Sequence, residues 1–75
     1  MSDAFNPITP RVGQRVRVDL SGMQLPHRVL EPGVVVVGTV THIDPATRRL
    51  TIRLDISVDG YNLVTADPGR ILAIS

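Results

Sequence analysis

Two stretches of this chain alternate apolar and polar residues with a period of two. Residues 15–20 read RVRVDL, and residues 49–58 read RLTIRLDISV. Because successive side chains of a strand point to opposite faces of a sheet, this pattern predicts two strands that each bury one face. In the second stretch, the face that we expect to be buried carries Leu50, Ile52, Leu54, Ile56 and Val58. No stretch has the three- and four-residue apolar spacing of a helix, so the sequence predicts an all-β fold.

Three further strands complete the prediction. Residues 34–43 are rich in β-branched side chains, which favour strands, and residues 61–66 and 71–74 are short apolar stretches next to turn residues. Residues 67–70, which read DPGR, predict a single 3-10 turn before the last strand. The sequence therefore predicts five short strands.

The connections between these strands have recognisable turn chemistry. In the segment DPATR, Pro45 presets the backbone torsion of a type I turn, and the carboxylate of Asp44 can accept a hydrogen bond from a following amide. In a loop of this length, Arg48 occupies a left-handed position where glycine is usual. Asp59 and Gly60 predict a second tight turn. Residues 21–33, with two prolines and two glycines, predict a long loop after the first strand whose apolar side chains fold back over the core.

The face that residues 34–43 bury is ambiguous. A four-residue loop would pair Asp44 with Arg49 and place Val35 and Val37 on the face of Leu50. The polar residues of this stretch favour the opposite face, with Val36, Gly38 and Val40 inside. Either the loop differs by one residue, or a bulge near Gly38 reconciles the two patterns.

The order of these elements resembles that of the SH3-like small barrels. The stretches that carry the resemblance are VGQRVRV at the front, GTVTHIDPATRRLTIRL in the middle and VTADPGRILAI at the end. The resemblance implies one five-stranded SH3-like barrel over residues 11–75. Residues 1–10 carry Asn6-Pro7 and Thr9-Pro10 and show no periodicity, so they predict an extended, partly disordered lead-in. An OB barrel is the alternative, but it usually needs a longer chain and a helix between strands.

Two short stretches are also loosely similar to the type II dihydrofolate reductases, which are SH3-like barrels of similar length. GQRVRV and PGRILAI resemble the frame of that family. Its catalytic Gln-Ile-Tyr run, however, falls where this chain has Val64, Thr65 and Ala66. The reductase activity is therefore not expected here.

Composition sets the expected location. The first ten residues, MSDAFNPITP, have neither the basic nor the apolar region of a signal peptide, and the longest unbroken run of valine, isoleucine and leucine is Val34–Val37. We therefore expect neither a signal peptide nor a transmembrane helix. The chain has no cysteine, so disulfides do not stabilise it, and we expect a cytoplasmic location.

The arginines raise the question of nucleic-acid binding. The two alternating stretches place Arg15 and Arg17 on one outward face with Asp19, and Arg49 and Arg53 on another with Asp55. The net charge is only +1, with eight arginines, no lysine and seven acidic residues, so these faces are charge-balanced. There are also too few aromatic residues for a stacking platform. Weak binding of nucleic acid by an SH3-like or KOW-like module is the alternative function, with candidate contacts at Arg15, Arg17, Arg48, Arg49 and Arg53.

Catalytic and cofactor chemistry is not expected. The chain has no glycine-rich phosphate loop and no serine in an activating context, and His27, His42 and Asp44 make too sparse a set for a metal. We expect no enzyme activity, no metal and no cofactor.

The run Val34–Val37 is the strongest candidate for a binding surface. It is apolar on both faces, whereas a strand of a small barrel is covered only on its inside. Cover by the loop over residues 21–33 is the alternative explanation. We therefore expect a non-enzymatic protein-interaction barrel that acts as a homo-oligomer or as a small accessory subunit of a larger assembly. The candidate interface residues are Val34, Val35, Val36, Val37, Met23 and Leu25.

Overall fold

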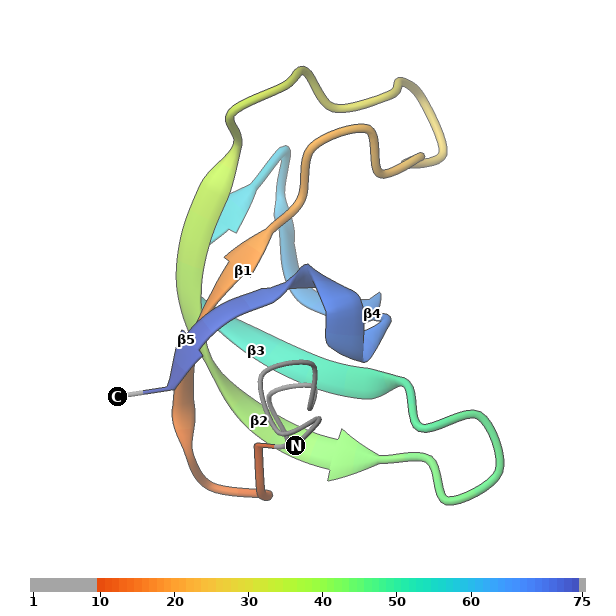
Figure 1. The fold of residues 1–75 in the computed structure, drawn as a ribbon. Coiled ribbons are helices and arrows are strands. Elements are labelled where there is room, and N and C mark those ends of the chain that lie inside the picture. The colour runs from red at the N-terminus through yellow and green to blue at the C-terminus, as the bar shows by residue number, and fades with distance from the viewer. Residues whose placement is uncertain (1–9, 75) are drawn as a thin grey trace, which may run out of the picture.

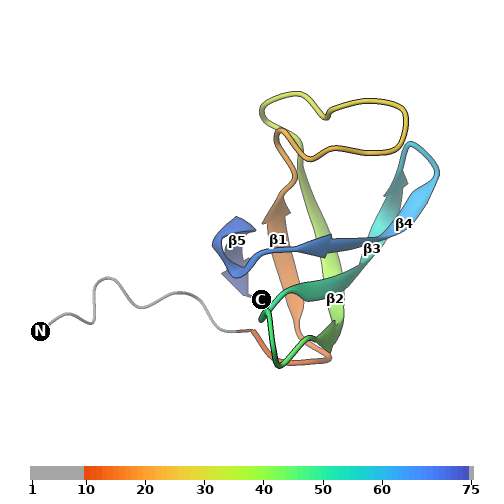
Figure 2. The same cartoon turned by 90° about the vertical axis from the view of Figure 1, so that its right-hand side faces the viewer.

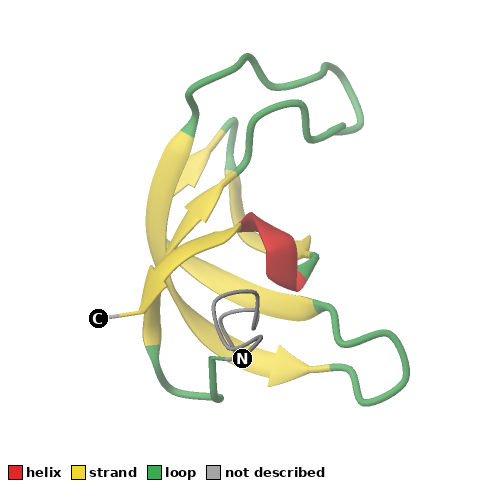
Figure 3. Cartoon of the chain, viewed as in Figure 1, coloured by secondary structure: helices red, strands yellow, loops and turns green. Residues whose placement is uncertain are grey.

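The computed structural model describes residues 10–74 as five antiparallel strands. The strands are β1 (Arg15–Asp19), β2 (Val35–Ile43), β3 (Leu50–Val58), β4 (Tyr61–Ala66) and β5 (Ile71–Ile74), and the 3-10 turn η2 (Pro68–Arg70) precedes β5 (Figures 1 and 3). This confirms the predicted all-β fold, with a long loop after the first strand and a 3-10 turn before the last. Residues 1–9, which make up most of the predicted lead-in, lie outside the described residues.

The strands form one curved sheet in the order β4-β3-β2-β1-β5, with β4 and β5 at its open edges. Strand β2 is shared between two halves of this sheet, because residues 35–39 pair with β1 and residues 38–43 pair with β3. The halves meet at Gly38, which pairs with both Val16 and Leu54, and at Thr39, which pairs with both Arg15 and Arg53. A Cβ atom at Gly38 would lie only 2.6 Å from the carbonyl oxygen of Arg53, so the close approach of β3 requires glycine here.

The buried side chains form one hydrophobic core. The 3-10 turn η2 lies on the concave side of the sheet (Figure 1). Alternate residues of the strands supply most of the core, as the period of two predicts. The buried core residues are Val16, Val18, Leu20, Leu30, Val40, Leu50, Ile52, Leu54, Val64, Ala66 and Ile71.

The register of β2 and β3 explains why the sequence pattern was ambiguous. Val40 pairs with Ile52, but His42 pairs with Thr51, so Thr41 is an extra residue on β2. The turn has the four-residue form, because the amide of Asp44 donates to the carbonyl of Arg49 at 2.9 Å. A bulge therefore does reconcile the two patterns, but its predicted place near Gly38 was wrong. It lies at Thr41, close to the turn, where an unpaired residue does not interrupt the junction with β1.

Both tight turns contain the backbone conformations that their sequences predict. In the β2–β3 turn, Arg48 has a φ of 63°, and the carboxylate of Asp44 accepts hydrogen bonds from the amides of Ala46 at 2.8 Å and Thr47 at 3.4 Å. These bonds lower the pKa of Asp44 below its usual value, because they favour the charged carboxylate. In the β3–β4 turn, φ is 52° at Asp59 and 84° at Gly60, as in a type I′ turn.

The long loop between β1 and β2 is packed against the body of the protein. Leu30 is buried, and Met23 and Leu25 pack against the core, as predicted for this loop. Val29, the fourth apolar residue of the loop, was expected to do the same but is 57 % exposed. The guanidinium of Arg28 forms an ion pair with Asp59 at 2.6 Å and thereby joins the loop to the β3–β4 turn. Figure 2 shows that the hairpin formed by the end of β3 and the start of β4 points away from β2 and toward the long loop.

Candidate interaction groove

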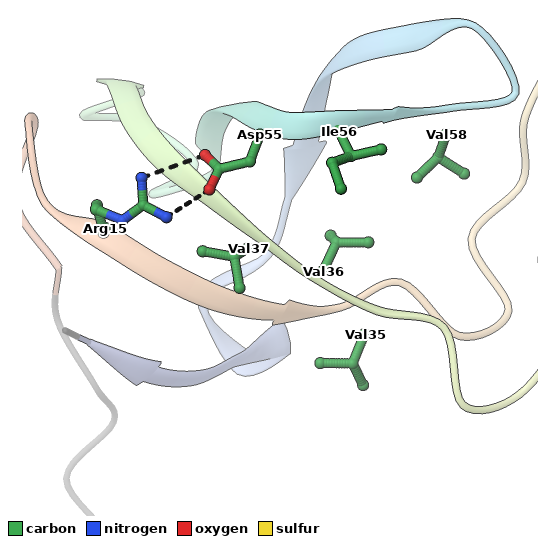
Figure 4. A pocket seen from close by; sticks show the side chains of 7 residues that line it. All are labelled: Arg15, Val35, Val36, Val37, Asp55, Ile56 and Val58. Carbon is green, nitrogen blue, oxygen red and sulfur yellow. Dashed lines mark hydrogen bonds and ion pairs between the residues drawn. The ribbon is translucent and has the colours of Figure 1, made fainter.

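An open groove lies where β2 and β3 separate. The pairing of these strands ends at Gly38 and Leu54, so the first residues of β2 and the last residues of β3 diverge. The space between them has a volume of about 460 Å³. We call it the interaction groove, and its lining residues are Arg15, Val35, Val36, Val37, Asp55, Ile56 and Val58 (Figure 4).

The groove is mainly aliphatic and reaches down to the core. Val36 and Val58 are half-buried and pack against the core, so they form its floor. Val35 is 41 % exposed on the β2 side, and Ile56 is 79 % exposed on the β3 side. In Figure 4 the side chains of Ile56 and Val36 face each other across the groove. An apolar partner that filled this space would extend the core and remove both exposed side chains from water.

The exposure of Ile56 corrects the sequence prediction, which placed it on the buried face. The β3–β4 pairing shifts register between Arg53 and Val58, so the alternation of inside and outside is broken there. The apolar positions of β4 carry the signal for this shift. The apolar residues of β4 are first the odd-numbered Tyr61 and Leu63 and then the even-numbered Val64 and Ala66, so the alternation shifts by one residue. Sequence reasoning therefore missed Ile56 and Val58 as groove residues.

One end of the groove is closed by an ion pair between Arg15 of β1 and Asp55 of β3. One guanidinium nitrogen donates to Oδ1 of Asp55 at 3.3 Å, and the other donates to Oδ2 (Figure 4). Both side chains are substantially exposed, and such pairs contribute only about 0.2–1 kcal/mol to stability. The main effect of this pair is to leave the groove with one positive and one negative group.

The candidate interface residues separate into two sets. Val35, Val36 and Val37 line the groove. Val34, Met23 and Leu25 pack against the core and do not line the groove. Val36 belongs to both sets, because it lies opposite Val18 on the core face and also lines the groove.

The candidate arginines also separate. Arg15, Arg17 and Arg53 lie on the outer face of the sheet, whereas Arg48 and Arg49 lie at the β2–β3 turn. Arg15 is paired with Asp55, and Arg49 is paired with Asp67 at 3.2 Å. Arg17, Arg48 and Arg53 form no ion pair with another described residue. The structure therefore does not gather the five arginines into a single basic patch.

The potential metal ligands among residues 10–74 do not cluster. No three potential ligands among His, Cys, Asp and Glu lie close enough to hold a metal ion within this range. His27 and His42 are both exposed. The same part of the chain contains no helix with the length and apolarity needed to cross a bilayer.

Comparison of the chain with protein-family models, with curated proteins and with solved structures found no match. A function is therefore inferred from the groove and from the charges around it.

Proposed function

We propose that the chain folds as an SH3-like small barrel and acts by protein contact, without enzyme activity of its own. The barrel assignment is supported by the long loop after β1, the two tight turns and η2 before β5, together with the strand order. In this view β2 belongs to both halves of the barrel and passes from one half to the other at Gly38 and Thr39.

The observation that carries the proposed function is the aliphatic groove between β2 and β3. A domain of 75 residues has a small core and therefore a small free energy of unfolding. An apolar groove that stays open to water lowers this free energy further. Val35 and Ile56 lie on opposite sides of the groove, and together with its floor they form a continuous apolar surface rather than scattered single side chains. The proposed role is that of a homo-oligomer or of a small accessory subunit of a larger assembly.

Photo-crosslinking in living cells tests this function. A benzophenone amino acid replaces Ile56, and in a matched control it replaces Leu72, which is 48 % exposed on β5 and outside the groove. We expect the probe at position 56 to form a protein adduct that mass spectrometry identifies and that the probe at position 72 does not form. If position 56 forms no adduct above the control, contact through the groove is excluded.

A second candidate function is weak nucleic-acid binding by the outer face. The observation that favours it is the pair Arg17 and Arg53, which lie on that face without an ion-pair partner among the described residues. Each phosphate contact contributes about 0.9 to the slope of log affinity against log salt concentration. Fluorescence anisotropy with a labelled duplex should therefore show a slope near −1.8 for these two residues, and replacement of both by glutamine should abolish the binding. A slope near zero would exclude this function.

A further inference from the structure

The two walls of the interaction groove carry complementary features. The wall formed by β1 and β2 carries the cation Arg15 and the aliphatic residues Val35 and Val37. The wall formed by β3 carries the anion Asp55 and the exposed Ile56. Each wall therefore offers one charge at the same end of the groove and apolar side chains beyond it (Figure 4).

This arrangement meets the requirement of a two-fold interface. In such an interface the same surface appears on both subunits, so every charge must meet an opposite charge from the same patch. A two-fold axis along the groove would bring the β1–β2 wall of one copy against the β3 wall of the other. Arg15 would then exchange Asp55 of its own chain for Asp55 of the second copy. Ile56 would meet Val35 and Val37 of the second copy.

The charge of the whole chain also allows two copies to associate. Its formal net charge is +1, so long-range repulsion between copies is small. A partner of strongly negative or positive charge would gain little at this groove, because its one cation and one anion cancel. An occupant that itself carries one cation and one anion in the same arrangement can form ion pairs with both Arg15 and Asp55.

We infer that the occupant of the groove is a second copy of this chain, in a two-fold dimer where Arg15 and Asp55 form ion pairs between subunits. This inference rests on the proposed function and names its partner.

Complementary charge reversals test the dimer. Arg15→Asp alone puts two acidic groups opposite each other at both of the charge contacts between the subunits, and Asp55→Arg alone puts two arginines there. Each reversal should lower the association constant measured by sedimentation equilibrium by at least about tenfold, because like charges in an interface repel. An equimolar mixture of the two variants should form a heterodimer, since every cation then meets an anion.

A second ion pair on the surface supplies the matched control. Arg49 and Asp67 are also exposed and lie outside the groove. Arg49→Asp and Asp67→Arg should leave the association of the chain unchanged. Ile56→Asp, at a side chain that packs little in the monomer, should give a folded monomer by circular dichroism and sedimentation.

The outcomes separate the dimer from the proposed function. A wild-type chain that stays monomeric at about 100 μM, or two reversal variants that fail to associate when mixed, would overturn the dimer. If the probe at position 56 still forms an adduct with a different protein, contact through the groove stands while the second copy is excluded. If it forms no adduct at all, both are excluded.

Discussion

Gly38 is the residue on which the junction of the two sheet halves depends. A methyl group at this position would lie 2.6 Å from both the carbonyl oxygen of Arg53 and Cγ2 of Ile52. We expect Gly38→Ala to destabilise the protein by about 1–3 kcal/mol, because the backbone of β3 has to move to make room. Urea denaturation measures this change.

A glycine elsewhere in the chain provides the control for that measurement. A Cβ atom added at Gly69, in η2, meets nothing within 4 Å, and its φ is not in the left-handed region. Gly69→Ala should therefore shift stability by less than about 0.5 kcal/mol. Equal unfolding midpoints for the two variants would contradict the role assigned to Gly38.

Arg48 is a residue with a Cβ atom at a position that favours glycine. Its φ of 63° places a residue with a Cβ atom in the left-handed region, which costs about 1–2 kcal/mol. Arg48→Gly removes that strain but increases the freedom of the unfolded chain, so we expect a net gain of about 0.5–1 kcal/mol in the free energy of unfolding. Arg48→Ala removes the charge and keeps the strain, so a similar gain in that variant would assign the effect to charge instead.

At the scale of elements, the β2–β3 turn gives the protein a predictable acid sensitivity. The amides of Ala46 and Thr47 lower the pKa of Asp44 in the folded state, whereas the unfolded value is about 3.9. The stabilisation is fully present above the unfolded pKa and is lost as pH falls through the lower folded pKa. Asp44→Asn keeps an oxygen acceptor but does not titrate. Between about pH 5 and about pH 3, its urea midpoint should therefore fall less than that of the wild type. Identical pH dependence would show that Asp44 does not contribute.

The long loop between β1 and β2 behaves as a structural element of the core. Leu30 is 2 % exposed, whereas the neighbouring Val29 is 57 % exposed. Leu30→Ala should destabilise the protein by about 2–5 kcal/mol, because it leaves a cavity under the loop. Val29→Ala changes a similar side chain on the solvent side and should have an effect below about 0.5 kcal/mol in the same denaturation experiment. Comparable losses would mean that the loop does not cover the core as described.

The elements themselves were largely predictable, and their registers were not. A period of two identifies β1 and β3 because burial of one strand face selects it directly. The bulge at Thr41 could not be placed from the sequence. The turn and the polar pattern require one unpaired residue on β2 but do not say which residue it is. The register shift between β3 and β4 was missed for the same reason, and with it the exposure of Ile56.

At the scale of the whole molecule, salt distinguishes the two candidate functions. A dimer held mainly by aliphatic contacts should lose less than about tenfold in association constant when sodium chloride rises tenfold, because only its exposed ion pairs are screened. Nucleic-acid binding through Arg17 and Arg53 should lose about 60-fold over the same range. Sedimentation equilibrium and fluorescence anisotropy give the two values. A loss of dimer as steep as that of nucleic-acid binding would contradict an aliphatic interface.

The sequence by itself determined the strands, the turn residues and the apolar excess in Val34–Val37, because these follow from local alternation and from the backbone preferences of single residues. Only the tertiary structure decided which of these valines face the groove. That choice depends on where β2 exchanges one neighbouring strand for the other and on where the pairing with β3 stops. Arg15 and Asp55 are 40 residues apart in the chain. They come together because Thr39 of β2 pairs with Arg15 on one side and with Arg53, two residues before Asp55, on the other. Contacts between distant strands are set by register, and a single unpaired residue changes them.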